Sequence, residues 1–158
     1  MAQILKAPAD LSRIQFPKRS VFLAGSIEMG EAENWQEVVE ESLAPEPVTI
    51  LNPRRDDWDS SWVQSIHNKQ FREQVGWELR AMEAAAVIGM YFSPGTKSPI
   101  TLLELGVWAG DPKLMVFCPE GFWRKGNVDI VCVHYPTETA RSMDEFIELI
   151  KRKLRYAG

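Results

Sequence analysis

A single carboxylate stands in the most apolar helix-like segment of this chain. From Ser98 to Ala109 the sequence reads SPITLLELGVWA, and Glu104 is the only ionisable residue between Lys97 and Asp111. A helix that is apolar nearly all round is normally buried. A buried carboxylate without a partner is unfavourable by several kcal/mol, or stays protonated through a raised pKa. Glu104 is therefore either held in a dry wall for chemistry or tipped outward, to solvent or to cap a backbone group.

A second acidic residue falls on an apolar face at helical spacing. Glu78 lies three residues after Val75 and shares the predicted face with Leu79. Two carboxyl groups that point into one crevice suit glycosidic chemistry, in which one attacks the anomeric carbon and another group handles the proton. The competing interpretation is a glutamate at the helix edge that pairs with Arg72 or Arg80.

Polar residues that could bind a ligand occur in three predicted loops. Gly25 and Ser26 follow an apolar run, and a glycine there lets a backbone approach a ligand closely. The segment lacks the glycine spacing of a dinucleotide fold and the Lys-Ser/Thr of a P-loop, so a plain tight turn is the alternative. Ser98 ends the third such loop and, with Pro99 after it, is predicted to open a helix.

The second loop, residues 52–59, reads NPRRDDWD. Asp and Asn can hold sugar hydroxyls, Arg can hold a carboxylate or phosphate, and Trp can stack on a base. The alternative is a network of Arg–Asp pairs at the surface. The candidate substrate-binding residues of this loop are Asn52, Arg55, Asp56, Asp57 and Trp58.

The elements that must position these residues alternate along the chain. Apolar runs predict strands at residues 20–24, 48–51, 86–92, 114–118 and 128–133, and helical spacing predicts helices at 34–43, 71–82, from 98 onward and at 143–155. Strands separated by helices predict an α/β fold, a doubly wound five-stranded parallel sheet with helices on both faces. Ligands bind such sheets outside the carboxyl ends of the strands, where the strand order reverses. The three polar loops should therefore share one crevice.

Length and composition set the class of protein. The 158 residues suit one domain, 1–158, of which 1–18 is expected to be an N-terminal extension. A net charge of −4 argues against a partner that is a nucleic-acid polymer or an anionic membrane. Neither a run of 18 apolar residues nor a signal peptide is found, so a cytoplasmic location is expected.

Cysteine and histidine add little chemistry. Cys118 and Cys132 lie in apolar runs, which favours buried thiols in a reducing compartment over a disulfide. His67 and His134 are too few and too dispersed for a metal site. We therefore expect no metal and no cofactor.

Four motifs together resemble the nucleoside 2-deoxyribosyltransferase-like family. They are FLAGSI, NPRRDDWD, F-x-x-Q-V-x-W-E and SPITLLELGVWA, in that order, and the resemblance covers residues 21–118. It implies a flavodoxin-like doubly wound domain in which the glutamate of Glu-Leu-Gly, here Glu104, is the nucleophile. Glu104 would attack C1′ of a nucleoside, release the base and carry the sugar as a covalent ester. A second base or water would then resolve that ester.

The resemblance leaves three functions open. Transferases of the family often carry Asp six residues before the nucleophile, whereas this chain has Ser98, and related nucleotide N-hydrolases use a serine near that place to hold a 5′-phosphate. Glu78 stands where many relatives have Asp. The candidates are a transferase that exchanges bases on 2′-deoxynucleosides, an N-glycoside hydrolase acting on a nucleoside, nucleotide or NAD-like ligand, and a nucleotide-binding sensor without turnover.

Relatives of this family complete the active site with residues of a neighbouring chain, so at least a homodimer is expected. The expected small-molecule partners are a nucleoside or nucleotide and a free base. Large aromatic residues late in the chain point the same way, because exposed apolar patches mark interfaces. The alternative is that these rings pack under the loop at residues 119–127. They are Trp108, Phe122, Trp123 and Tyr135.

Overall fold

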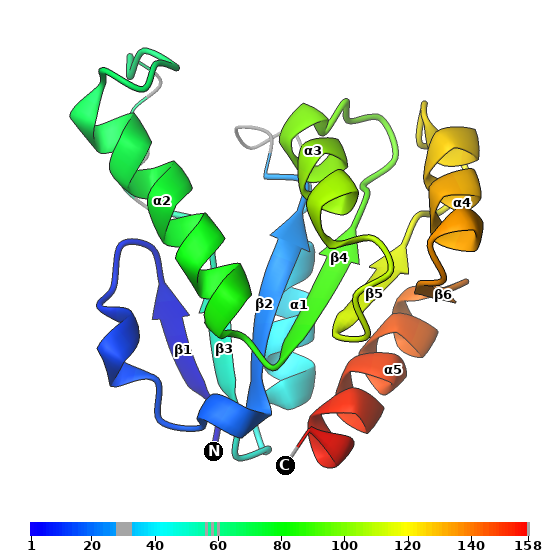
Figure 1. Ribbon diagram of the computed structural model, residues 1–158. Coiled ribbons are helices and arrows are strands. Elements are labelled where there is room, and N and C mark those ends of the chain that lie inside the picture. Colours follow the sequence, from blue (N-terminus) through cyan, green and yellow to red (C-terminus); the bar gives the residue numbers. More distant parts are fainter. Residues whose placement is uncertain (28–32, 56, 58, 60, 158) are drawn as a thin grey trace.

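The computed structural model describes residues 1–27, 33–55, 57, 59 and 61–157. Within these residues, six strands form one parallel sheet with helices packed against it, an α/β fold (Figure 1). The strands are β1 (Gln3–Lys6), β2 (Ser20–Gly25), β3 (Thr49–Asn52), β4 (Val87–Tyr91), β5 (Leu114–Phe117) and β6 (Glu138–Ala140). The helices are α1 (Trp35–Leu43), α2 (Lys69–Ala84), α3 (Pro99–Trp108), α4 (Lys125–His134) and α5 (Met143–Tyr156), with short 3-10 turns at Leu11–Arg13 and Pro17–Arg19.

The strand order reverses its direction of winding at the central strand β2. The order across the sheet is β1-β3-β2-β4-β5-β6. The chain therefore winds from β2 to one side, through β3, and then crosses to the other side at β4. In a parallel sheet the connections leave opposite faces at this point, and ligands bind there, outside the carboxyl ends of the strands; we call the region at the ends of β2 and β4 the crevice. Both arrowheads point to the top of Figure 1, where α3 lies above them.

Two hydrophobic cores fix the helices on the two faces of the sheet. Successive strand residues point to opposite faces, so Phe22 packs with Trp77 of α2 and Leu105 of α3, on the face that α4 also covers. Leu23 packs instead with Trp35 of α1, on the face that α5 covers. Each buried large apolar side chain contributes roughly 1.5–3 kcal/mol to stability. These contacts hold α2 and α3 against β2.

The predicted strand at residues 128–133 is wrong, because this segment lies inside α4. Val128 and Cys132, one helical turn apart, are buried, whereas Ile130 and Val133 are exposed. A short apolar run fits a buried strand and a helix equally well, and here the helical period prevails. The other four predicted strands are present, each with ends within one residue of the prediction.

The prediction of five strands is also wrong, because the sheet has six. Strand β1 lies within residues 1–18 and pairs in parallel with β3 at the sheet edge, and β6 pairs with β5 at the other edge. Both edge strands are short, each contains two polar residues, and each is exposed at two positions. Edge strands of this kind carry a weak apolar signal.

Candidate active site

Three hydroxyl groups meet at the carboxyl ends of β2 and β4. Ser26, Thr96 and Ser98 are almost completely buried. The Ser26 hydroxyl lies 3.1 Å from that of Thr96, which lies 2.8 Å from that of Ser98, and the Ser26 and Ser98 hydroxyls are also hydrogen-bonded to each other. The backbone N–H of Ser93 donates to Ser26 Oγ over 3.0 Å. We call Ser26, Thr96 and Ser98 the hydroxyl cluster.

Ser98 joins this cluster to helix α3. It is the N-cap residue of α3 and has φ of 45°, a left-handed conformation that few residues other than glycine adopt. Such a backbone persists only where its surroundings hold it, and the hydroxyl cluster does so. Pro99 at the first helical position then starts α3, as predicted. The cluster therefore fixes the entry of the helix that carries Glu104.

Gly25 is required by packing at the end of β2. A side chain there would meet the backbone oxygen of Tyr91 and would place its Cβ 2.7 Å from the ring of Trp35. The Trp35 indole N–H donates to the backbone oxygen of Ser26 over 3.1 Å. The glycine thus lets β2 and β4 close on Trp35 and brings Ser26 to the crevice.

Helix α3 is less buried than the sequence predicts. Thr101 and Leu105 face the core, whereas Ile100, Leu103 and Val107 are 56%, 66% and 63% exposed. The sequence predicts a helix that is buried all round, whereas α3 has one buried side and one apolar side that is exposed. Glu104 lies between these two sides, next to the buried one, and its side chain is only partly exposed.

The two predicted carboxylates come within electrostatic reach of each other. Burial raises the pKa of Glu104 to about 8, and the negative charge of Glu78 on α2 raises it as well. Burial raises the pKa of Glu78 to about 7, against the effect of a hydrogen bond from Gln74, which lowers it. Two like charges cannot both ionise readily in a poorly hydrated site. Near neutral pH the pair therefore retains a proton that it can pass on.

The rotation of α2 differs from the prediction. Gln74, Trp77, Ala81 and Met82 form its buried face, and Leu79, which was expected beside Glu78 on that face, is 46% exposed. Trp77 sets the rotation, because its indole N–H donates to the backbone oxygen of Ala9 over 2.8 Å. Glu78 accepts from Gln74 over 2.9 Å, whereas Arg72 donates to the backbone oxygen of Ile66. The predicted partner Arg72 is thus directed elsewhere.

Asn52 ends β3 and uses its amide within the protein. It is 2% exposed, its Nδ2 donates to Glu40 over 2.7 Å, and its Oδ1 accepts the backbone N–H of Arg54 over 2.9 Å. This arrangement ties the start of the loop to α1. It stabilises a tight turn at the edge of the crevice.

Arg55 forms the centre of the loop after β3. Its guanidinium makes two hydrogen bonds to Asp57, each 2.9 Å long, and lies 4.9 Å from the ring centre of Trp62. The pKa of Asp57 is lowered by these bonds. Arg55 Nη1 also donates to Gln74 Oε1 over 3.4 Å. The Arg55–Asp57 pair is thereby connected to α2, the helix that carries Glu78. The predicted residues Asp56 and Trp58 lie outside the described residues.

Sequence reasoning missed two residues of the site. Gln74 stands one helical turn before Glu78 in the F-x-x-Q-V-x-W-E motif, and this i, i+4 spacing is the signal that could have identified it. Thr96 lies two residues before Ser98 in the same loop. Among the described residues, no group of three or more His, Cys, Asp or Glu is placed to hold a metal ion.

The family comparison covers this whole site. A family model described as "Nucleoside 2-deoxyribosyltransferase like" matches residues 18–122, more than half of the chain. The chain belongs to this family. No curated protein matches it. The matched stretch contains the hydroxyl cluster, the loop after β3 and both carboxylates.

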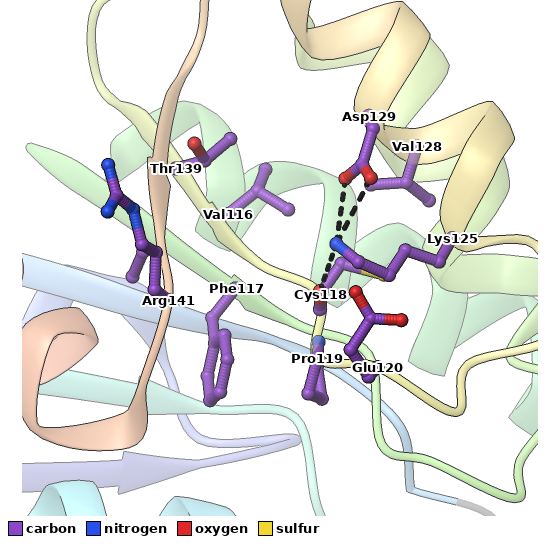
Figure 2. Close-up of a pocket in the computed structure, with 11 residues that line it drawn as sticks. Val116, Phe117, Cys118, Pro119, Glu120, Lys125, Val128, Asp129, Thr139 and Arg141 are labelled. Atoms are coloured by element: carbon purple, nitrogen blue, oxygen red, sulfur yellow. Dashed lines mark hydrogen bonds and ion pairs between the residues drawn. The ribbon is translucent and has the colours of Figure 1, made fainter.

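The chain also forms a cavity at the carboxyl ends of β5 and β6, and part of its lining lies beyond the family's matched stretch. It encloses about 320 Å³ and is lined by residues from Val116 to Arg141. Figure 2 shows Lys125 there between Asp129, 3.1 Å away, and the backbone oxygen of Cys118, 3.0 Å away. Burial raises the pKa of Cys118 to about 12, so its thiol stays protonated. None of the predicted site residues lines this cavity.

The structure also bears on the predictions for the cysteines and the late aromatic residues. Cys118 and Cys132 are free and buried, as predicted. Of the late aromatic residues, Phe122 is buried against Phe92, whereas Trp123 and Tyr135 are about half exposed. None of the helices in the described ranges is long and apolar enough to cross a membrane.

Proposed function

We propose that this protein cleaves the N-glycosidic bond of a 2′-deoxynucleoside and transfers the sugar to a second base, through an ester on Glu104. The observation that carries the proposal is the pairing of Glu104 with Glu78 beside the crevice, in a member of the nucleoside 2-deoxyribosyltransferase-like family. The order β3-β2-β4-β5-β6 supports the flavodoxin-like type, which binds ligands at this same switch point.

The pKa of Glu104 is raised further than that of Glu78, so the proton of the pair must first pass from Glu104 to Glu78, which leaves Glu104 as the attacking carboxylate. A Glu104 oxygen attacks C1′ and forms the ester as the C1′–N bond breaks. The electron pair of that bond goes to the base nitrogen, and the base receives the proton of Glu78. The neutral base leaves, with the sugar on Glu104 and Glu78 ionised.

The second half-reaction returns both groups to their starting state. The incoming base attacks C1′ through a nitrogen that bears a proton, and Glu78 accepts that proton. The C1′–O bond to Glu104 breaks, and its electron pair stays on the carboxylate. Water in place of the base would give the free sugar with the same proton transfer. The low hydration of Glu104 helps its attack in the first step.

Substrate binding is assigned to the groups around this pair. The hydroxyl cluster can donate to and accept from the 5′ group of the sugar. Gly25 and Asn52 shape the crevice wall, and Arg55 with Asp57 borders it on the side of α2. Asp56 and Trp58 remain predicted ligands of the sugar and base. No cofactor takes part in this scheme.

A hydrolase is the second candidate, favoured by one observation. Ser98 occupies the position, six residues before Glu104, where transferases of the family often have Asp. Incubation with a 2′-deoxynucleoside and a different free base, followed by chromatography, separates the possibilities. The proposal predicts a new nucleoside. Free sugar without exchange would establish the hydrolase, and intact substrate with measurable binding would leave a sensor.

Replacing Asp57 or Arg55 with alanine is expected to weaken substrate binding by roughly 1–3 kcal/mol, because each change removes a charged, two-bond interaction from the crevice border. Isothermal titration calorimetry with a nucleoside measures the change. Asp59→Ala is the matched control, since Asp59 lies in the same loop and accepts from the backbone of Ser61. Unchanged affinity in both test variants would make the Arg55–Asp57 pair a surface network.

The chain is expected to form at least a homodimer through the outer side of α3. Ile100, Leu103 and Val107 lie at i, i+3 and i+7, and all three are exposed. Exposed apolar stripes of this kind mark interfaces. Light scattering at micromolar concentration should give at least twice the 18.0 kDa of one chain.

Leu103→Glu should dissociate the dimer, because it places a charge in the apolar stripe. Val38→Glu on α1 is the control, because Val38 is also exposed but lies on the helix that covers the other face of the sheet. A fully active wild-type monomer at the same concentration would contradict the inference.

A further inference from the structure

We propose that Gln74 is a positioning residue that holds the Glu78 carboxyl and separates it from the positive charge of Arg55. This inference rests on the proposed function for its catalytic meaning. Gln74 lies on α2, one turn before Glu78, and is 3% exposed. The proposed mechanism gives Gln74 no part in binding the substrate or in the attack by Glu104.

Both N–H donors of the Gln74 side-chain amide make hydrogen bonds. Nε2 donates to Glu78 Oε1 over 2.9 Å and to the backbone oxygen of Pro53 over 3.2 Å. Oε1 accepts from Arg55 Nη1 over 3.4 Å. A glutamine amide has two N–H donors, and both are thus used.

Chemistry fixes the orientation of this amide. Its nitrogen faces two acceptors, the Glu78 carboxylate and the Pro53 carbonyl, and its oxygen faces the guanidinium of Arg55. The reversed amide would set N–H against N–H at Arg55 and oxygen against oxygen at Glu78 and Pro53. The three partners therefore agree on one orientation, which holds the loop after β3 against α2.

The neutral amide gives Glu78 a hydrogen bond without giving it a counter-charge. A direct Arg55–Glu78 ion pair would favour the charged carboxylate strongly and would leave it a poor proton donor. Gln74 bonds to both groups, and Asp57 accepts hydrogen bonds from Nε and Nη2 of Arg55. The groups that act on Glu78 are thus Gln74 on its own helix, Glu104 from α3 and, at one remove, Arg55 from the loop.

The consequence is a Glu78 that can both release and regain a proton. Burial favours its protonated form, whereas the hydrogen bond from the amide favours its ionised form. Loss of the amide should shift this balance toward the protonated form. Arg55 would lose its bond to α2 but keep both hydrogen bonds to Asp57, and an apolar side chain of similar size at position 74 would still separate it from Glu78.

The test compares Gln74→Leu and Gln74→Met with the wild type. The carboxyl carbons of Glu78 and Glu104 are followed by NMR as the pH is varied, in the protein without substrate. The expected result in each folded variant is an upward shift of the Glu78 midpoint by about one pH unit, because a hydrogen bond to the charged form is lost. Methionine matches glutamine in length, so it keeps the test valid if leucine disturbs the fold.

Kinetics provide the second reading. In both variants the rate of base release should fall about tenfold or more, and the alkaline side of its pH profile should move to higher pH with the Glu78 midpoint, because the first half-reaction needs protonated Glu78. Glu83→Gln, an exposed change on the same helix, is the control and should alter neither. An unchanged or lowered Glu78 midpoint in the folded variants would overturn the inference. The titration needs no turnover, so a wild-type protein without glycosyl chemistry would refute the proposed function and leave Gln74 to be judged by its midpoint shift alone.

Discussion

Glu104→Gln is expected to lower turnover by about three orders of magnitude or more, because an amide neither attacks C1′ nor serves as the leaving carboxylate. Helix α3 should be unaffected, since the side chain keeps its size. The measurement is a single-turnover assay of base release from a 2′-deoxynucleoside. Turnover near that of the wild type would remove Glu104 from the mechanism.

The same variant should also be more stable than the wild type at neutral pH. The pKa of Glu104 is raised to about 8 in the folded chain. As pH rises from the ordinary glutamate range toward 8, the unfolded chain releases this proton first, so the carboxyl destabilises the fold progressively. The gain should be on the order of 1–3 kcal/mol near pH 8, a few degrees in Tm, and should vanish below a pH of about 4.

Glu148→Gln on the exposed surface of α5 is the matched control for both readings. It should change neither turnover nor the pH dependence of the melting temperature. A stability gain for Glu104→Gln that is the same at acidic and neutral pH would show that the titration of this carboxyl is not its cause.

Glu78→Gln is expected to lower turnover by roughly two to four orders of magnitude, the usual contribution of a positioned proton donor. The loss should be smaller for a substrate whose base is a good leaving group, because such a base departs with little need of a proton. Base release should therefore be measured for a series of nucleosides with bases of different acidity. An equal loss across the series would contradict the role in proton transfer.

Glu78→Gln should also shift the titration of its partner. Removing the negative charge opposite Glu104 lowers the pKa of Glu104, because that charge contributes to raising it. NMR titration of the Glu104 carboxyl measures the shift. Leu79→Gln, a change at the next position on the exposed side of α2, is the control and should leave the Glu104 titration unchanged.

The main features of the site could be predicted because they depend on local patterns. Buried parallel strands read as continuous apolar runs, so β2 to β5 and the loops at their carboxyl ends were found. Ser98 and Pro99 carry a helix-start signal in adjacent residues. The position of Glu104 on α3 follows from that start.

Contacts between distant segments explain what sequence reasoning missed. Trp77 sets the rotation of α2 by reaching Ala9, so the exposure of Leu79 could not be read from α2 alone. Asn52 is held by Glu40 on α1, a contact that the residues of its own loop do not reveal. In α4, the apolar run at residues 128–133 carries no local mark that distinguishes a strand from a half-exposed helix.

The most direct test of the central claim is to trap the ester on Glu104. A nucleoside with fluorine at the 2′ carbon and a good leaving base slows breakdown of the ester, so the intermediate can accumulate. After acid quenching and trypsin digestion, mass spectrometry should find the fluorinated sugar on the peptide of residues 98–113, whose carboxylates are Glu104 and Asp111. Fragmentation should place it on Glu104, and Glu104→Gln should carry none. A sugar on another residue, or base release in the wild type with no adduct, would contradict the claim.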